Sequence, residues 1–224
     1  MKHYLVFLFL AFLSLNNFAQ DIKQTDTLSF KEKKWKLSTH LVSQPYIFNT
    51  DQGYPNLFTG IGITRKIGKF GVRLNYNYFD NDKSGPFTID SVNSFEDITY
   101  TKEHALRLGI EYQANYSKMF SVLFFADYIF APFNSNYTVF KGNEAPIISA
   151  ETYGICNGAT LGIGINFSFN EHISLSGETR LDFLSLQQNQ EIKNYNNGTI
   201  VEYQTSQSTM NLKLIGTISI NYHF

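Results

Sequence analysis

The chain has 224 residues, a formal net charge of -1 and a single cysteine. A chain without excess positive charge has no electrostatic basis for binding nucleic acid, and one cysteine cannot form an internal disulfide. Aromatic residues make up 16% of the chain, with 14 Tyr and 21 Phe, and these residues favour β-strands and membrane interfaces.

The N-terminus is predicted to be an export signal over residues 1–20. Lys2 and His3 give it a basic start, residues 4–15 form an apolar run, and Ala19 fits a cleavage position. The run is shorter than the ~20 residues that a membrane-spanning helix requires. Residues 21–34 are polar and without period, which predicts a periplasmic tail before a folded domain over residues 35–224.

Downstream of the tail, apolar and polar residues alternate with period two, which is typical of strands that bury one face and not the other. One example is the segment from Phe70 to Tyr78, where Phe, Val, Leu, Tyr and Tyr alternate with Gly, Arg, Asn and Asn. The pattern predicts strands over residues 35–41, 60–67, 70–78, 105–113, 120–128, 153–168, 173–183 and 212–224.

The connections between these strands alternate between long and short. Long polar loops are predicted over residues 49–56, 80–97, 132–150 and 187–204, and short turns at 68–69, 115–118 and 170–171. Outer-membrane barrels have an even number of strands, short periplasmic turns and long extracellular loops. We therefore predict an all-β, eight-stranded antiparallel up-and-down transmembrane β-barrel with both termini in the periplasm.

The last strand, Asn211–Phe224, alternates Leu212, Leu214, Ile218 and Ile220 with polar residues and stops on an aromatic residue. It resembles the closing strand of bacterial outer-membrane barrels, and the whole mature chain resembles the eight-stranded OmpA-transmembrane and OmpX type of Bacteroidota. The resemblance implies an outer-membrane location in contact with lipid and lipopolysaccharide. It also implies that Tyr222 and Phe224 form the signal read by the barrel-assembly machinery.

With the apolar face toward lipid, the ionisable residues of the strands fall inside. The predicted interior charge network comprises Arg73, Arg107, Glu111, Asp127, Glu178, Arg180, Asp182 and Lys213, with Lys36, His40 and Glu103 nearby. We expect ion pairs between Arg73 and Glu111, Arg107 and Asp127, and Lys213 and Asp182. So few strands leave no open channel, so the charges are expected to form a salt-bridged plug. Glycines on the same face are expected to leave room for these side chains: Gly60, Gly62, Gly109, Gly158, Gly162 and Gly164.

A catalytic role is the weaker hypothesis. Small barrels that modify lipid A carry a His with a Ser and an acid at the outer rim, and here only His104, beside Glu103 and Thr101, is a candidate. An interfacial polar role fits His104 better. Cys156 is interpreted as a small filler, and no spacing of His and Cys predicts a metal site or a cofactor.

Three function classes remain open. The first is a monomeric, non-enzymatic barrel whose surface loops contact lipid, other cells or partner proteins; the second is a narrow porin or small-solute channel; the third is a lipid A-modifying enzyme. The loops carry no motif that identifies a partner. Thr27 and Ser91 lie in short patterns that resemble the O-glycosylation sites of exported Bacteroidota proteins.

Overall fold

The computed structural model describes residues 33–46, 56–88, 94–141 and 146–224. The expected export signal, most of the tail, and Thr27 and Ser91 lie outside the described residues. Eight strands make up the fold: β1 (Trp35–Ser43), β2 (Asn56–Ile67), β3 (Phe70–Thr88), β4 (Ser94–Asn115), β5 (Phe120–Lys141), β6 (Pro146–Ser168), β7 (Ile173–Asn194) and β8 (Thr199–His223).

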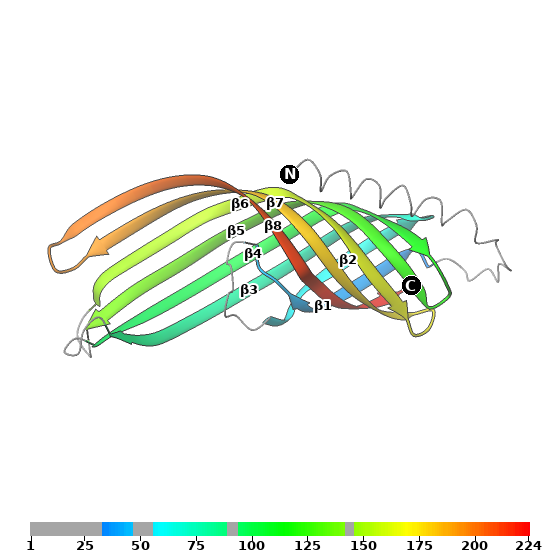
Figure 1. Cartoon of the computed structure of the whole chain (residues 1–224), viewed down its shortest axis with the longest axis horizontal. Coiled ribbons are helices and arrows are strands. Elements are labelled where there is room, and N and C mark those ends of the chain that lie inside the picture. Colours follow the sequence, from blue (N-terminus) through cyan, green and yellow to red (C-terminus); the bar gives the residue numbers. More distant parts are fainter. Residues whose placement is uncertain (1–32, 47–55, 89–93, 142–145) are drawn as a thin grey trace. The chain divides into compact units, whose positions relative to one another are not determined.

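Each strand pairs antiparallel with its neighbours in sequence, and β8 pairs back to β1, so the sheet is a closed ring (Figure 1). The two ends of the ring are joined at Trp35 and Phe224, whose backbone N–H groups each donate to the other's carbonyl oxygen at 3.0 Å. The predicted all-β, up-and-down, eight-stranded barrel is thus confirmed. No helix among the described residues is long and apolar enough to cross a membrane.

The side chains of the strands point alternately into and out of the ring, as the alternation of polar and apolar residues predicts. In β5 the odd residues from Ser121 to Ala131 are buried inside the ring, whereas Phe120, Tyr128 and Phe130 are exposed outside it. A strand points successive side chains to opposite faces, so one period fixes the facing of the whole element. The large apolar residues are therefore mostly outside, and the charged residues inside.

The predicted long loops are mostly wrong. β3 and β4 stay paired out to Thr88 and Ser94, β5 and β6 to Phe140 and Pro146, and β7 and β8 to Asn194 and Thr199. At these three places only short connections remain, whereas the first predicted loop, residues 49–56, lies almost entirely outside the described residues. Near the ring the inward face of the extension is still buried, at Phe79, Glu103 and Phe133, whereas β8 is exposed on both faces from Thr199 to Met210. Backbone hydrogen bonds hold the strands together regardless of polarity.

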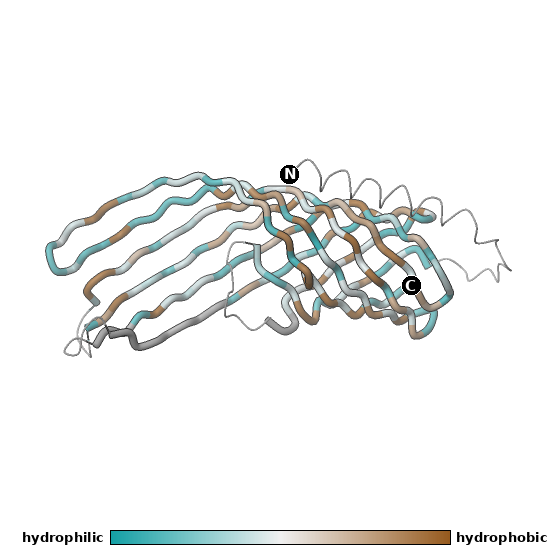
Figure 2. Tube along the Cα trace, viewed as in Figure 1, coloured by the Kyte–Doolittle hydropathy of each residue, from teal (hydrophilic) through white to brown (hydrophobic). Residues whose placement is uncertain are grey.

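We call these outer parts of β3–β8 the extension. On β3 it begins after Asn77, the last residue that pairs with β2. On β8 it comprises the residues before Thr217, the first residue of β8 that pairs with β1. β1 and β2 are only 9 and 12 residues long, whereas β3–β8 have 19 to 25. The ring and the extension are both visible in Figure 1, and the tip of the β7–β8 hairpin is mostly polar in Figure 2.

The opposite end of the ring, which we call the turn side, holds the short connections. The predicted turn at residues 68–69 is confirmed, and Gly68 has a φ of 61°, a left-handed conformation that glycine adopts without a steric penalty. The other two turn-side connections, residues 116–119 and 169–172, lie within a residue or two of the predicted ones.

One irregularity interrupts the closing strand. Glu178 of β7 pairs with Thr217, but Arg180 pairs with Lys213, so residues 214–216 of β8 face the single residue Thr179. This bulge reverses two predictions: Ile215, expected inside, is 55% exposed, and Gly216, expected outside, is buried. A β-carbon added to Gly216 would lie 3.0 Å from Cγ of Arg180, so the glycine leaves room for that side chain.

Candidate functional site

The candidate site is the interior of the ring, and it is built in layers. The predicted network residues all project inward, and six of them have buried side chains with at most 4% exposure: Arg73, Arg107, Glu111, Asp127, Arg180 and Asp182. The Glu178 side chain is 9% exposed and Lys213 is partly exposed. Inward positions carry these charges because their strands place every second residue in the lumen.

At the centre of the charged layer, Glu178 binds two arginines. Its carboxylate lies 2.9 Å from Nη2 of Arg73 and 3.4 Å from Nη1 of Arg107. Asp127 lies near the same two side chains, 3.2 Å from Nε of Arg73 and 3.7 Å from Nη1 of Arg107. The Asp127 contacts are ion pairs without hydrogen-bond alignment. Two carboxylates thus neutralise two guanidinium groups away from bulk water.

The predicted pair of Arg73 and Glu111 is present at 3.7 Å, but Glu111 has a closer partner in Lys36, whose Nζ is 2.8 Å from both carboxylate oxygens. The register explains why Arg73 reaches further than expected. Gly109 stands opposite Arg73 on one side and Asp127 on the other. Because Gly109 has no side chain, Arg73 extends across β4 to Asp127.

A segment that the sequence analysis missed lies over the charged layer. After β1 the chain turns inward, and Arg180 donates from Nη2 to the carbonyl oxygen of Gln44 at 2.6 Å, while Nζ of Lys213 donates to the carbonyl oxygen of Pro45. The backbone N–H of Tyr46 donates to the Glu103 carboxylate at 2.8 Å. We call Gln44–Tyr46 the inner segment.

The inner segment changes the pairing predicted for Lys213. Asp182 pairs with Arg180, at 3.2 Å, and the contact found for Lys213 is the Pro45 carbonyl rather than the predicted Asp182. The Tyr46 ring also lies 4.3 Å from the guanidinium carbon of Arg180 and 5.3 Å from Nζ of Lys213. Pro45 is the only signal in the sequence, since proline cannot donate to a strand ladder.

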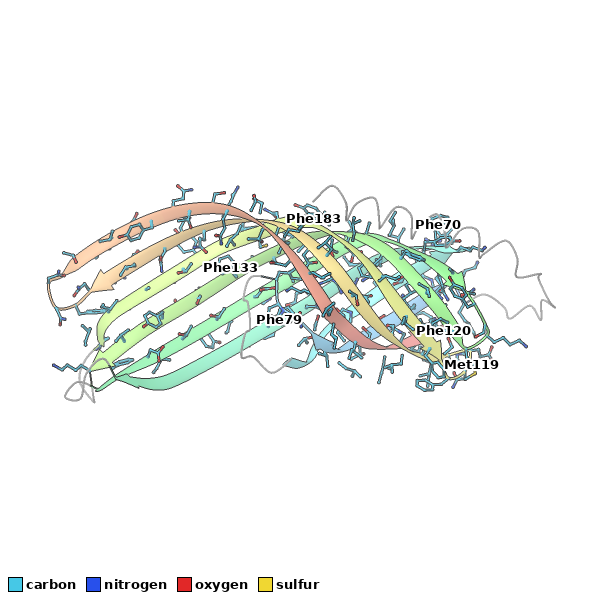
Figure 3. All side chains as sticks on the ribbon, viewed as in Figure 1. Phe70, Phe79, Met119, Phe120, Phe133 and Phe183 are labelled. Carbon is cyan, nitrogen blue, oxygen red and sulfur yellow. The ribbon has the colours of Figure 1, made fainter. Side chains whose placement is uncertain are left out.

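An apolar layer lies on the extension side of the charges. It joins the Tyr46 ring to inward residues of β3–β7, and Phe79 and Phe133 are its largest members from the strands (Figure 3). The full cluster is Tyr46, Phe79, Ala105, Ile129, Ala131, Phe133, Cys156, Leu184 and Leu186. Cys156 is 1% exposed and has a free thiol. The layer fills the lumen where the ring opens into the extension.

On the turn side, the lumen is filled by small uncharged polar groups. Asn221 accepts from the Ser38 hydroxyl at 2.7 Å and donates to Ser174 and Ser176 at 3.2 and 3.1 Å. Ser174 also bonds Nε2 of His223 at 2.8 Å. The period-two alternation predicts that these residues face inward, but it does not identify them as a connected network, because serine and asparagine are common in many strands.

His104 lies outside the ring, apart from the interior site. Its Nδ1 is 2.8 Å from the Tyr76 hydroxyl, and its ring centroid is 5.0 Å from that of Tyr78. Glu103 and Thr101, the expected neighbours, are buried on the opposite face of β4. The contacts found for His104 are thus aromatic and phenolic, without the serine and acid that an acyl-transfer site needs.

The described residues contain no group of three or more His, Cys, Asp or Glu side chains that would hold a metal ion. The interior side chains make ion pairs and hydrogen bonds with one another.

No family model and no curated protein matches the chain. Among solved structures, the chain is similar to a major outer membrane protein from Thermus thermophilus, with a TM-score of 0.53, 13% identity, and coverage of 85% of this chain and 99% of that one. CarO from Acinetobacter baumannii has a TM-score of 0.39 at 13% identity over 85% of this chain and 96% of that one. Outer Membrane Protein W of E. coli has 0.37 at 12% identity over 87% and 100%. The first likeness supports the closed β-barrel fold, and at these identities fold is all that it supports.

Proposed function

We propose that this chain is an integral outer-membrane β-barrel protein with a closed interior and a structural or interaction role at the cell surface. The observation that carries the proposal is the inverted polarity of the ring. Apolar side chains project from the ring without cover, whereas its charges are buried, the reverse of a soluble domain. The exposed apolar residues of the ring include Ile61, Ile63, Val72, Leu74, Leu106, Leu108, Ile110, Leu161, Ile163, Ile165, Ile173, Leu175 and Ile220.

Aromatic residues border this apolar band, as they do at the two interfaces of a membrane. On the turn side, Phe70 packs against Tyr112 with ring centroids 5.2 Å apart, and Tyr222 stacks on Phe224 at 5.9 Å. On the extension side, the cluster of Tyr76, Tyr78 and His104 borders the band. This arrangement supports a membrane location for the ring. We propose that the turn side, where Trp35 and Phe224 meet, faces the periplasm, because outer-membrane barrels have their short turns there.

The layered interior supports a closed lumen rather than a pore. Arg73, Arg107 and Glu178 fill the middle, and the apolar layer covers them toward the extension. A conducting pore requires a continuous water path, and a layer of packed phenylalanine, leucine and isoleucine side chains opposes ion passage. We therefore assign the charges a plugging role.

The extension is the part of the molecule that offers contact area for partners. It projects beyond the ring, and β8 is exposed there on both faces from Thr199 to Met210, so we propose that it contacts lipopolysaccharide or a protein outside the cell. The barrel-assembly machinery is the partner expected during insertion, and a monomer is the expected state of the mature barrel.

A narrow channel for small solutes is the second candidate, and one observation favours it. The Asn221 network on the turn side and the charged layer beside it both line the lumen with polar groups. Under this alternative, displacement of the inner segment and the apolar layer would open the lumen. For a lipid-modifying activity, no serine or acid is found in contact with His104 among the described residues.

The proposal is tested by fractionation and by single-channel recording. The protein is expected in the outer-membrane fraction, to migrate faster on a denaturing gel before heating than after it, and to show no stable conductance after refolding into planar bilayers. Steady openings whose size changes in an Arg107→Ala variant would establish the channel instead. Recovery in a soluble fraction, with no heat-dependent change in migration, would contradict the membrane location itself.

A further inference from the structure

The sheet of the extension has a free edge at β3 and another at β8. In the described part of the chain, β3 beyond Asn77 pairs only with β4, and β8 from Thr199 to Lys213 pairs only with β7. These two strands form the opposite margins of the extension in Figure 1. The outer side of an edge strand presents backbone N–H and C=O groups with which another strand can pair.

The two edges differ in how well their sequences protect them against pairing. Natural edge strands exclude unwanted partners with charged residues and with proline, which cannot donate a backbone hydrogen bond. The part of β3 in the extension contains three charged residues and a proline: Asp80, Asp82, Lys83 and Pro86. In β8 the segment Thr199–Asn211 contains one charged residue, Glu202, and no proline. A second strand is therefore opposed at β3 and hardly at β8.

The β8 edge is also open to solvent. Every residue from Thr199 to Met210 is exposed, on both faces of the strand. Large apolar side chains are among them, and Ile200 and Met210 are 60% and 57% exposed. Pairing with another strand would satisfy the backbone groups of the edge and cover part of these side chains.

The sequence of this edge is complementary to itself. Two copies of a strand can pair antiparallel about a two-fold axis, which brings residues of the same face opposite each other. With the axis at Thr205, Ile200 faces Met210 of the second copy. In the same register Glu202 faces Ser208. Apolar side chains thus meet each other, and the one charge of the edge does not oppose its own copy.

We propose that the β8 edge, Thr199–Asn211, pairs antiparallel with the same edge of a second copy of this chain, with Thr205 on the two-fold axis. The pairing rests on the proposed location of the extension outside the cell. Antiparallel strands point the two rings in opposite directions, so the two copies belong to facing membranes, and each barrel remains a monomer in its own. The edge then joins two outer membranes through backbone hydrogen bonds.

Clustering of lipid vesicles tests the pairing. The mature protein is reconstituted in vesicles, heat-dependent migration on a denaturing gel verifies that the barrel has formed, and added protease verifies that the extension lies outside. Wild-type vesicles are expected to cluster, measured by light scattering, whereas protein-free vesicles stay dispersed. Vesicles that pass both checks and stay dispersed would overturn the pairing and leave the membrane location intact. A chain that never enters the vesicles would contradict the membrane location itself.

A charge exchange at the axis tests whether the partner is a second copy. Thr205→Lys places two ammonium groups opposite each other, and Thr205→Glu places two carboxylates. Each variant alone is expected to cluster at least about tenfold less than wild type, because like charges face each other, and a mixture of the two should cluster like wild type. The control is Asn196→Lys at the exposed tip of the β7–β8 hairpin, which should cluster normally. A mixture of the Lys and Glu variants that stays dispersed would contradict the pairing.

Disulfide formation between copies tests the register. In a Cys156→Ala background, Thr205→Cys is expected to link two copies, because the two Cα atoms across the axis lie about 4.5–5.5 Å apart. Ser206→Cys is the matched control, since its two Cα atoms would be more than about 7 Å apart. Equal linkage at both positions would contradict an axis at Thr205. On intact cells, disulfides from Thr205→Cys to other proteins, with none between two copies, would assign the edge to a different partner and overturn the proposal.

Discussion

Among the interior carboxylates, Glu178 makes the closest contacts with two arginines. It contacts both Arg73 and Arg107, and each arginine is at most 2% exposed. The free energy that such a buried pair adds is small compared with that of well-packed apolar residues, because removing the charges from water costs much of the attraction. Loss of one partner is different, since it leaves the other charge buried and unpaired.

We therefore predict that Glu178→Gln destabilises the barrel by about 3 kcal/mol or more. The change keeps the size of the side chain and removes the charge that faces two arginines. The measurement is denaturant-induced unfolding in lipid vesicles. The matched control is Glu171→Gln at the turn side, where the side chain is 49% exposed and its contact with His172 is at 4.0 Å. Similar stabilities for the two variants would mean that the charged layer is not held by its pairing.

Among the strands, a glycine on the inner face leaves space into which a large side chain of the neighbouring strand can pack. Gly162 of β6 stands opposite Phe125 of β5, and a β-carbon on Gly162 would overlap the Phe125 ring. That ring in turn lies 4.3 Å from the guanidinium carbon of Arg73. The glycine thus positions an aromatic side chain against the central arginine, an arrangement that the period-two pattern predicted only as room for long side chains.

Gly162→Ala is predicted to destabilise the barrel by about 1–3 kcal/mol, the usual cost of overpacking. Gly177→Ala on β7 is the control, because a β-carbon there would meet no atom within 4 Å. The free energy of unfolding of the two variants is compared in the same vesicles. If Gly162→Ala were as stable as Gly177→Ala, the Phe125 ring would be free to move away, and its position against Arg73 would not be fixed by the strand pairing.

For the molecule as a whole, the ring depends on contacts between its first and last strands. Trp35 and Phe224 exchange two backbone hydrogen bonds, and the Phe224 ring stacks on Tyr222. A closed barrel has no free edge within the ring. Its stability and its rate of assembly therefore depend on both partners of this last pairing.

Deleting Phe224 is predicted to lower the yield of folded barrel more than Phe224→Ala does. The substitution removes the stacking but keeps both backbone hydrogen bonds, whereas the deletion also removes the bonds, about 2 kcal/mol in net terms. The fraction of heat-modifiable protein after refolding measures the yield. Equal yields for the deletion and for Phe224→Ala would show that the aromatic side chain, and not the ring closure, controls assembly.

From the sequence alone, the alternation of apolar and polar residues with period two predicts the strands and the face to which most of their side chains point. It assigned each side chain to the inner or outer face, because successive residues of a strand point in opposite directions, and so it identified the charges inside and the apolar band outside. It failed where that signal is absent. In the outer part of the extension polar residues occupy both faces, so the sequence predicts loops over residues 80–97, 132–150 and 187–204, although backbone pairing continues through most of them.

Only the tertiary structure decided which charges meet. Arg73 reaches Asp127 across Gly109, Lys36 takes Glu111, and Lys213 donates to Pro45. These pairings depend on the stagger of the strands and on the bulge opposite Thr179, which place residues far apart in the sequence at one level of the lumen. The inward turn of Gln44–Tyr46 has the same origin: its carbonyl groups find their donors on β7 and β8, more than a hundred residues away, and a local pattern contains no information about partners at that separation.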